Sequence, residues 1–165
     1  MTRAALALGA NLNSPRDTLL SAQVALLARP ASPLRLLAAS PLYATEPVEG
    51  PSQPWFLNQV LLVEGAFSAE MLLLLARAVE RAHGRSRAVP KGPRILDVDL
   101  LFVDGAILCT KRLTLPHPAL HRRRCVLAPL CDVAPEWRHP RLGATAKELL
   151  ARCPLPGRVL RLGPG

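Results

Sequence analysis

Aromatic residues are scarce in this chain of 165 residues, which contains three Phe, one Tyr and two Trp. Between Arg77 and Arg124 eleven Arg or Lys stand against four acidic residues, and Phe102 is the only aromatic residue. Modules that bind single-stranded nucleic acid stack the bases on several aromatic rings, so the sequence disfavours that class. A basic region with a single aromatic residue is better suited to a small polyanion, such as a nucleoside triphosphate.

The sequence also lacks the signatures of several other classes. The four cysteines form no CxxC pair and no Cys/His spacing of a zinc site, which predicts free thiols in a cytoplasmic protein. No apolar run reaches transmembrane length, and Met1 to Gly9 is typical of a short strand rather than a signal peptide. Neither GxxxxGK(S/T) nor GxGxxG occurs, so a P-loop kinase and a Rossmann dehydrogenase are disfavoured.

What is present indicates one folded domain spanning residues 1–165. Half of the residues are hydrophobic and 20% are charged, which is typical of a globular protein. Eighteen of the 21 basic residues are Arg, and the formal net charge is +9. A GC-rich genome would explain the excess of Arg without any acidic ligand, and the composition alone leaves that alternative open.

The most informative stretch reads Lys-Gly-Pro-Arg-Ile-Leu-Asp-Val-Asp. Asp97 and Asp99 lie two apart near the end of an apolar run that predicts an interior strand, so both carboxylates should point to one face. Two such charges repel unless a cation lies between them, and an oxygen-only pair suits Mg²⁺ accompanied by substrate phosphates. Arg85, Arg87 and Arg94 lie just upstream, and this combination favours phosphoryl transfer. The alternative is a pair of solvated aspartates on a strand edge.

Hydrophobic periodicity and capping residues predict the elements that lead to this stretch. Strands are expected over 4–9, 34–43, 56–67 and 95–103. Ser14 and Pro15 predict the start of a first helix, whose buried stripe comprises Leu20, Val24 and Leu27. Ser68 predicts the start of a second helix that ends at Gly84, with a buried face of Leu72, Leu75, Val79 and Ala82. The loop 45–54 is long enough to suggest a functional role.

Beyond the aspartates, Asp104-Gly105 predicts a hairpin turn that returns the chain through residues 106–109. Short helices are expected over 121–131 and 147–152, and the last dozen residues are expected to be weakly ordered. The order βαββαβ predicts an α+β fold with a ferredoxin-like core, in which helices cover an antiparallel-rich sheet and further elements are appended at the C-terminus.

Seven short motifs occur in one order along residues 4–140. They are Leu8 to Leu12, Ser40 to Pro47, Gln53-Pro54 with Phe56 to Asn58, Glu80 with Gly84 to Arg87, Gly92 to Asp99, Leu115 to Pro118, and Arg123 with Val126 to Leu130. In this order they resemble the 6-hydroxymethyl-7,8-dihydropterin pyrophosphokinase family of folate biosynthesis. The resemblance implies transfer of the terminal pyrophosphate of ATP to the hydroxymethyl group of the reduced pterin, leaving AMP.

The resemblance also implies roles for individual residues. Asp97 and Asp99 would each hold Mg²⁺, with one of two ions orienting the attacking hydroxyl and the other bridging the phosphates. Arg85 and Arg94 would be catalytic residues that stabilise charge on the phosphates. The residues implied in ATP binding are Arg77, Glu80, Arg87, Leu96, Arg112, Thr114, His117 and Arg123. The implied partners are ATP and the pterin, without nucleic acid or membrane, and the implied form is a monomer.

A further set of residues is implied in pterin binding. These residues are Thr45, Pro47, Val48, Phe56, Asn58, Lys91 and Cys125. Asn58 carries the donor and the acceptor that an aminopyrimidinone edge requires, and Phe56 would stack on the ring. Without the family pattern, Asn58 would be interpreted as a turn residue and Phe56 as a core residue. The loops 45–54 and 85–93 would close over the substrates.

Three positions depart from the family pattern. Lys91 and Cys125 stand where the family commonly has aromatic residues that cover the two faces of the pterin, and Ala10 stands where Ser is common. The missing rings predict weaker pterin binding, by about 0.5–1.5 kcal/mol for each stacking contact. None of the three belongs to the carboxylate pair or to the phosphate-binding arginines, so we expect the reaction itself to be retained.

Two other interpretations remain open from the sequence. A basic ferredoxin-like domain can bind RNA, although this chain lacks the aromatic strand motifs of such modules. An inactive regulatory domain of the same fold would have a broken carboxylate pair, whereas Asp97 and Asp99 are both present. Thermal stabilisation by a nucleotide with Mg²⁺, compared with stabilisation by RNA, distinguishes these classes.

Overall fold

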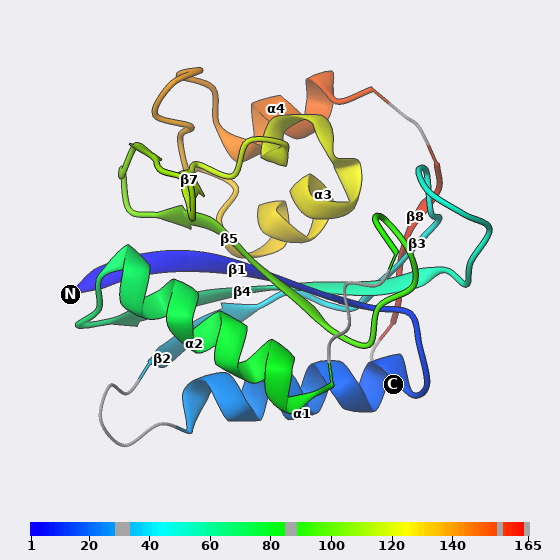
Figure 1. Ribbon diagram of the computed structural model, residues 1–165. Coiled ribbons are helices and arrows are strands. Elements are labelled where there is room, and N and C mark those ends of the chain that lie inside the picture. The colour runs from blue at the N-terminus through cyan, green and yellow to red at the C-terminus, as the bar shows by residue number, and fades with distance from the viewer. Residues whose placement is uncertain (29–33, 85–88, 155–156, 164–165) are drawn as a thin grey trace.

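The computed structural model describes residues 1–28, 34–84, 89–154 and 157–163 (Figure 1). Its elements, in chain order, are β1 (Thr2–Ala10), α1 (Pro15–Leu27), β2 (Arg35–Ala39), β3 (Tyr43–Thr45), β4 (Phe56–Gly65), α2 (Ala69–Ala82), β5 (Asp97–Val103), β6 (Leu108–Cys109), β7 (Thr114–Leu115), the 3₁₀ turn η1 (Leu120–Arg122), α3 (Arg124–Val133), α4 (Ala146–Arg152) and β8 (Val159–Arg161). The predicted strands 4–9, 56–67 and 95–103 are confirmed as β1, β4 and β5.

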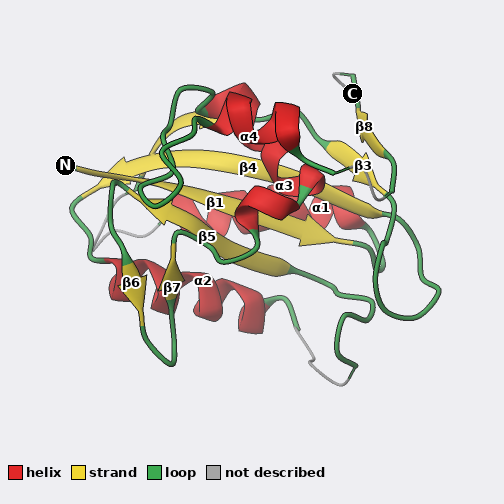
Figure 2. Ribbon diagram, turned by 90° about the horizontal axis from the view of Figure 1, so that it is seen from above, coloured by secondary structure: helices red, strands yellow, loops and turns green. Residues whose placement is uncertain are grey.

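One six-stranded sheet organises the molecule, in the order β5-β1-β4-β3-β8, with β2 also paired to β4. All of these pairs are antiparallel. Helices α1 and α2 cover one face of the sheet, and α3 and α4 lie against the other (Figure 1, Figure 2). The elements β1, α1, β2, β4, α2 and β5 form the ferredoxin-like core, which confirms the predicted fold class.

Each face of the sheet has its own hydrophobic core. Beneath α1 and α2 the buried side chains include Leu6, Leu8, Leu19, Leu72 and Leu96. Beneath α3 and α4 they include Ala5, Val60, Leu101, Leu127 and Leu149. Because strand side chains alternate between the two faces, β1 and β5 contribute to both cores. The sheet is therefore held rigidly between two packed layers, and this rigidity fixes the residues at its ends.

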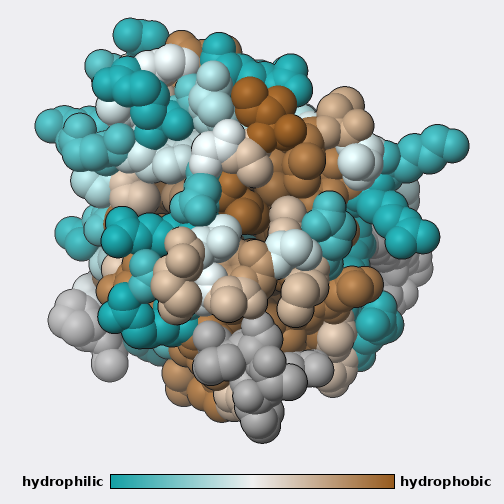
Figure 3. Space-filling view, turned by 90° about the vertical axis from the view of Figure 1, so that its left-hand side faces the viewer, coloured by the Kyte–Doolittle hydropathy of each residue, from teal (hydrophilic) through white to brown (hydrophobic). Residues whose placement is uncertain are grey.

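The buried face of α1 differs from the predicted stripe. Leu20 and Val24 have 62% and 59% of their surface exposed, whereas Leu19, Ala22 and Leu26 are buried. Apolar residues occur on almost every side of this helix, so the periodicity does not select one face. Hydrophobic surface is common on this molecule, and Figure 3 shows it between hydrophilic side chains at the end where β1 begins.

Helix α2 is bounded as predicted. The hydroxyl of Ser68 accepts a hydrogen bond from Met71 N–H at 3.2 Å, and Gly84 follows the helix with φ of 74°. Of the predicted face, Leu72 and Val79 are buried, Leu75 is half-buried and Ala82 is exposed. A charged residue, Glu80, is buried on this helix with 3% of its surface exposed. A buried carboxylate requires a partner, and that partner lies in the candidate site.

The strand predicted over 34–43 is broken into β2 and β3. Pro41 lies at the break, where its missing N–H cannot take part in the ladder. Just before it, Ser40 N–H donates to Val60 O at 2.9 Å, and Ser40 Oγ accepts from Val60 N–H at 2.9 Å. The serine hydroxyl therefore replaces a backbone acceptor and lets the chain enter β3 at a new position along β4.

The hairpin predicted at Asp104-Gly105 is wrong. Asp104 does form a turn, with φ of 44°, but the strand that follows it pairs with β7 in a separate two-stranded sheet. The free edge of β5 is used instead by the segment after β7, because His117 N–H donates to Leu101 O at 2.9 Å. This arrangement brings residues 110–118 beside the aspartates.

Near the C-terminus the predicted helices are confirmed. Of the last dozen residues, which were expected to be weakly ordered, 155–156 and 164–165 lie outside the described residues and 159–161 form a strand. The segment 121–131 forms the end of η1 and most of α3, and α4 matches the prediction for 147–152. The tail contains β8, which pairs with β3. All four cysteines are free, as predicted. Among the described residues, no helix combines the length and the apolar character that a membrane span requires.

Candidate active site

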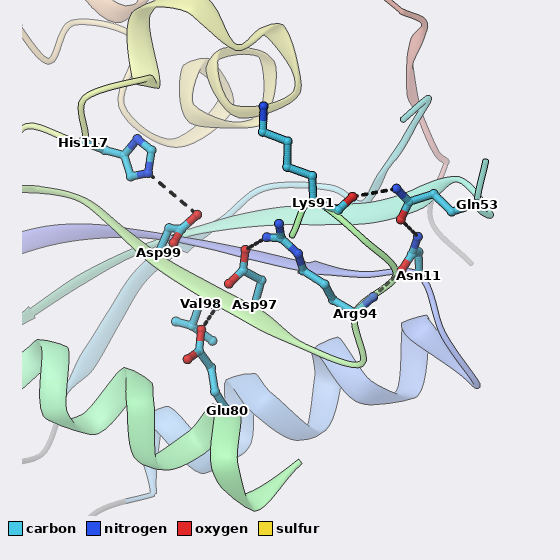
Figure 4. Close-up of polar contacts among 9 residues, drawn as sticks. All are labelled: Asn11, Gln53, Glu80, Lys91, Arg94, Asp97, Val98, Asp99 and His117. Carbon is cyan, nitrogen blue, oxygen red and sulfur yellow. Dashed lines mark hydrogen bonds and ion pairs between the residues drawn. The ribbon is translucent and has the colours of Figure 1, made fainter. Parts of the chain in front are cut away.

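Asp97 and Asp99 lie at the start of β5, and their side chains point to the same face of the strand, as predicted (Figure 4). Val98 between them belongs to the core beneath α1 and α2. The prediction of an interior strand was wrong, because β5 is an edge of the sheet. The outward N–H of Val98 donates to Glu80 Oε1 at 2.8 Å, so a buried carboxylate from α2 covers this edge.

Two pockets meet at Asp99. The larger has a volume of about 530 Å³ and is lined by residues of β1, β3, β4 and β5, the loops before β4 and β5, and the start of α3. The smaller has a volume of about 250 Å³ and is lined by residues of α2, β5 and the segment from β6 to η1. Asp99 lines both pockets, whereas Asp97 and Arg94 line the larger one. A group at this junction can contact ligands in both pockets at once.

All of the residues predicted to bind the pterin line the larger pocket. They are Thr45, Pro47, Val48, Phe56, Asn58, Lys91 and Cys125. They come from four parts of the chain that lie far apart in the sequence: β3 and the loop after it, β4, the loop before β5, and the start of α3. A pocket with largely apolar walls and a few polar groups is what a flat heterocycle requires.

The predicted ATP-binding residues are distributed less uniformly. Those that line the smaller pocket are Arg77, Glu80, Arg112, Thr114 and His117. Arg123 lines the larger pocket. Leu96 is fully buried in the core and lines neither pocket. Arg85 and Arg87 lie outside the described residues.

A buried amide, Asn11, fastens the loop that carries Arg94 to the end of β1 (Figure 4). Asn11 Oδ1 accepts from Arg94 N–H at 2.8 Å, and Asn11 N–H donates to Arg94 O at 3.0 Å. Asn11 Nδ2 donates to Gln53 Oε1 at 2.9 Å, and Gln53 Nε2 donates to Lys91 O at 2.9 Å. The loop before β4 and the loop before β5 are therefore joined at one point beside the larger pocket.

The two aspartates have different electrostatic surroundings. The Arg94 guanidinium donates to Asp97 Oδ2 and compensates its charge. For Asp99, burial and then the negative charge of Asp97 raise the pKa above its ordinary value. Two carboxylates held this close favour a cation or a proton between them, which is the expected property of a cation-binding pair.

His117 faces this pair as a neutral group. Its Nε2 lies 3.9 Å from Asp99 Oδ2, and burial, followed by the charge of Arg123, lowers the pKa of His117 to about 4. His117 Nδ1 accepts from Ala119 N–H at 3.2 Å, so the proton of the neutral ring lies on Nε2. His117 can therefore donate a hydrogen bond toward the junction of the two pockets without adding a charge.

The polar end of the larger pocket is built around Asn58. Asn58 Nδ2 donates to Thr45 Oγ1 at 2.5 Å, which fixes the direction of the amide. Gly9 lies opposite Asn58 in the ladder of β1 and β4, and a Cβ on Gly9 would lie 2.8 Å from Asn58 Oδ1. Glycine is therefore required for the amide to lie flat over β1 at the floor of the pocket.

Two of the three departures from the family pattern, Lys91 and Cys125, lie in this pocket. Lys91 Nζ forms an ion pair with Glu49 Oε2 at 2.6 Å, and both side chains are exposed. The hydrogen bond from Lys91 lowers the pKa of Glu49 below its ordinary value. Cys125 is half-buried, and burial raises the pKa of its thiol, so the thiol is neutral at pH 7. An ion pair and a thiol therefore occupy the positions where aromatic rings are common.

The donor set fits Mg²⁺ brought by a polyphosphate. Among the described residues, no group of three His, Cys, Asp or Glu side chains could hold a metal ion by itself. Mg²⁺ usually keeps several waters and binds through one or two carboxylates together with substrate phosphates. Asp97 and Asp99 supply two carboxylates on one face beside several basic groups, and this matches that requirement.

Sequence reasoning missed several residues that line the pockets. In the larger pocket they are Glu46, Glu49, Arg122, Arg124 and Val159, and in the smaller pocket Thr110 and Lys111. The run Arg122 to Arg124 offered a signal, because three consecutive arginines at a helix start place at least one toward the adjoining pocket. Val159 offered none, because nothing in the sequence near the C-terminus indicates pairing with β3.

Comparisons with known proteins agree with this geometry. A family model described as 7,8-dihydro-6-hydroxymethylpterin-pyrophosphokinase (HPPK) matches residues 5–135. A protein of Pseudomonas aeruginosa named 2-amino-4-hydroxy-6-hydroxymethyldihydropteridine pyrophosphokinase is 39% identical over 94% of each chain. A protein of the same name from Methylorubrum extorquens is 37% identical over 92% of this chain and 94% of its own.

Solved structures give the same fold at lower identity. The wild-type HPPK-DHPS protein of Plasmodium falciparum with SDX-DHP superposes with a TM-score of 0.67 at 16% identity, over 92% of this chain and 43% of its own. A structure titled as HPPK-DHPS in complex with substrates gives a TM-score of 0.70 at 13% identity, with 92% and 45% covered. This chain therefore spans less than half the length of these larger proteins.

Proposed function

Because the chain belongs to the 7,8-dihydro-6-hydroxymethylpterin-pyrophosphokinase family, we propose that it transfers the terminal diphosphate of ATP to 6-hydroxymethyl-7,8-dihydropterin in folate biosynthesis. The hydroxymethyl oxygen attacks the β-phosphorus, and the bond from that phosphorus to the oxygen bridging it to the α-phosphorus breaks. AMP leaves with that oxygen, and the hydroxyl proton is released. The products are AMP and the pterin diphosphate.

One observation carries this proposal: the two pockets meet at Asp99. A pterin in the larger pocket and ATP in the smaller one bring the hydroxymethyl group and the triphosphate together at the carboxylate pair. Holding two reactants in this geometry lowers the barrier by removing much of the entropic cost of their encounter. The larger pocket has more apolar than polar lining, which suits a flat heterocycle, and the basic residues that line both pockets suit a triphosphate.

Asp97 and Asp99 would hold Mg²⁺, with two ions expected. When bound, the metal would neutralise charge on the phosphate oxygens and lower the pKa of the attacking hydroxyl. Arg94, which bonds to Asp97 and is fastened by Asn11, is placed to stabilise charge that develops on the transferred group. His117 and Arg123 lie on the two sides of Asp99 and are placed to bind phosphate oxygens.

Asn58 would recognise the pterin through hydrogen bonds, and the pterin ring would stack on Phe56. The Asn58 amide, fixed by Thr45, offers one donor and one acceptor to the aminopyrimidinone edge. Phe56 is half-buried in the same pocket, so one face of its ring remains available. We infer that residues 1–165 act as a single domain, as a monomer, in the cytoplasm.

The test is a direct assay of the purified protein with ATP, Mg²⁺ and 6-hydroxymethyl-7,8-dihydropterin. We expect AMP and the pterin diphosphate in equal amounts, and no ADP. Asp99→Asn should reduce turnover by about 10²–10³-fold, because one carboxylate of the pair is lost. Asp104→Asn is the matched control, because Asp104 lies just beyond the same strand and lines neither pocket.

Several results would contradict the proposal. ADP in place of AMP would indicate transfer of one phosphoryl group rather than two. Turnover of Asp99→Asn equal to that of Asp104→Asn would remove Asp99 from the reaction. Stabilisation by RNA without stabilisation by an ATP analogue and Mg²⁺, measured as a melting temperature, would favour the nucleic-acid-binding alternative. A dimer in light scattering would correct the inferred monomer.

A further inference from the structure

The C-terminal segment 157–162 lies beyond the residues matched by the family model and forms a second edge of the sheet. In it, β8 runs alongside β3 (Figure 1, Figure 2), with Val159 opposite Thr45 and Arg161 opposite Tyr43. Leu162 N–H continues the pairing by donating to Leu42 O at 2.9 Å. The tail is therefore part of the sheet on the side where the larger pocket opens.

Val159 is the residue of this strand that reaches the pocket. It lines the pocket together with Thr45, its partner in the ladder. Side chains of directly opposed residues lie on the same face and contact each other. Because Thr45 Oγ1 accepts from Asn58 Nδ2, Val159 packs beside the hydroxyl that directs the pterin-reading amide. Its branched side chain bounds the pocket on this side.

Arg158 connects the tail to both ends of the loop that precedes β4. Its backbone O accepts from Glu46 N–H at 2.9 Å, and its own N–H donates to Glu46 Oε2 at 3.0 Å. Its guanidinium lies 4.8 Å from the centre of the Trp55 ring. Glu46 begins this loop and Trp55 ends it. Arg158 thus fixes the loop that supplies Pro47 and Val48 to the pocket.

A separate anchor holds the tail at its far end. Arg161 lies 3.4 Å from Asp132 Oδ1 on α3, and Tyr43 donates to Asp132 Oδ2 at 2.5 Å. None of these three residues lines either pocket. The anchor can therefore be removed to measure the general cost of loosening the tail, separately from the contacts that Val159 and Arg158 make.

We propose that residues 157–162 are a functional part of the pterin site, with Val159 as a specificity-determining contact and Arg158 as a positioning residue that acts through Glu46 and Trp55. This inference rests on the proposed function, because it takes a reduced pterin as the ligand of the larger pocket. One wall of the pterin site would then come from β8, which lies outside residues 5–135, the part of the chain that the family model matches.

The first test concerns Val159. Val159→Phe should fill the pocket and weaken binding of 6-hydroxymethyl-7,8-dihydropterin by about tenfold or more, as measured by calorimetry with a non-hydrolysable ATP analogue present. Affinity for the ATP analogue and the melting temperature should stay close to wild type. Leu160→Ala is the matched control, because Leu160 is the next residue of β8, is 49% exposed and lines neither pocket. Val159→Ala, which shortens the side chain and removes this wall of the pocket, keeps the test valid if the Phe variant does not fold.

The second test concerns Arg158. Arg158→Ala should raise KM for the pterin several-fold with little change in KM for ATP, and Arg158→Lys should recover part of this loss by restoring the charge opposite Glu46. Arg161→Ala is the control that loosens the tail without touching the pocket loop. A purely structural role predicts instead that Arg158→Ala and Arg161→Ala lower the melting temperature and affect both substrates alike.

The outcomes separate this inference from the proposed function. Wild-type protein that binds no pterin would overturn both. Wild-type protein that binds pterin, with a folded Val159→Phe variant of unchanged affinity, would overturn the role of Val159 alone. With Val159→Ala as the only folded variant, affinities equal to those of wild type for pterin analogues of different size would overturn it too. Equal effects of Arg158→Ala and Arg161→Ala would overturn the positioning role.

Discussion

At the scale of single residues, Gly9 shows how one missing side chain shapes the site. A Cβ there would lie 2.8 Å from Asn58 Oδ1, closer than a carbon and an oxygen can approach. We expect Gly9→Ala to displace the amide and to weaken pterin binding about tenfold, which corresponds to roughly one lost hydrogen-bond pair. Calorimetry of pterin binding measures the effect, and affinity for an ATP analogue should be unchanged.

Gly105→Ala provides the control for this prediction. A Cβ on Gly105 would meet nothing within 4 Å, and Gly105 lines neither pocket. Both variants add one methyl group to a glycine, so they differ only in what the methyl group contacts. Equal pterin affinity in the two variants would mean that the position of the Asn58 amide does not determine recognition.

Cys125 offers a second prediction at this scale. A ring at this position would face the pterin, because Cys125 is half-buried and lines the pocket opposite the sheet. We expect Cys125→Phe to tighten pterin binding by about 0.5–1.5 kcal/mol, the contribution of one stacking contact. Cys125→Leu adds volume without a ring and separates stacking from simple filling. If the melting temperature is retained and neither variant changes the pterin dissociation constant, Cys125 does not contact the ligand.

The residues predicted to bind the pterin all line one pocket, whereas the described residues predicted to bind ATP are divided between two pockets and the core. The motif around Asn58 lies on β4, and the register of a rigid strand carries its side chains to a definite place. Leu96 lines neither pocket, because a leucine in a motif is equally suited to the core, where it lies. Contacts such as Asn11 with Arg94 depend on how segments far apart in the sequence fold against each other, and sequence spacing does not determine this.

At the scale of elements, the loops before β4 and β5 are joined by charge in this chain. Lys91 pairs with Glu49, while Gln53 binds the backbone of Lys91. We expect Glu49→Lys and Lys91→Glu each to raise KM for the pterin several-fold, because like charges then oppose each other across the pocket mouth. The double exchange, which restores opposite charges, should recover most of the loss. A double variant as impaired as the sum of both single variants would exclude a direct interaction.

The same contact predicts a pH dependence. The Lys91 hydrogen bond and the nearby Arg122 and Arg123 lower the pKa of Glu49 from its ordinary 4.5. A carboxylate with a depressed pKa contributes its interaction above the ordinary pKa, and the contribution is lost as pH falls through the lowered value. The ion pair between Lys91 and Glu49 should therefore be intact at pH 6–8 and weaken only below about pH 4.5. Pterin affinity of the wild type, compared with Glu49→Gln across this range, checks the direction.

Elements with a strong local signal were predicted correctly, and those fixed by distant pairing were not. Ser68 caps the start of α2, and Gly84 ends it with a left-handed turn. Both signals are local, so the sequence near each end was sufficient to predict where the helix begins and ends. The strand after Asp104-Gly105 was given the wrong partner and the strand β8 was missed, because the pairings with β7 and β3 are determined by tertiary packing. For β2 and β3, Pro41 was a visible signal of the break.

At the scale of the whole molecule, the net charge of +9 is placed where it can act on a polyanion. The basic residues that line the two pockets are Arg77, Lys91, Arg94, Lys111, Arg112, Arg122, Arg123 and Arg124. The two pockets meet at Asp99, so their fields add there. A cleft lined by one sign of charge raises the local concentration of an oppositely charged ligand.

This arrangement predicts that the two substrates respond differently to salt. ATP is highly charged and the pterin is neutral, so KM for ATP should rise several-fold between about 0.05 M and 0.5 M salt while KM for the pterin stays nearly constant. Arg112→Gln should reduce the salt dependence for ATP, because Arg112 lines the smaller pocket. Arg16→Gln removes the same charge from an exposed position on α1 outside both pockets and should not. Equal effects of the two substitutions would mean that overall charge, rather than its placement at the pockets, attracts the nucleotide.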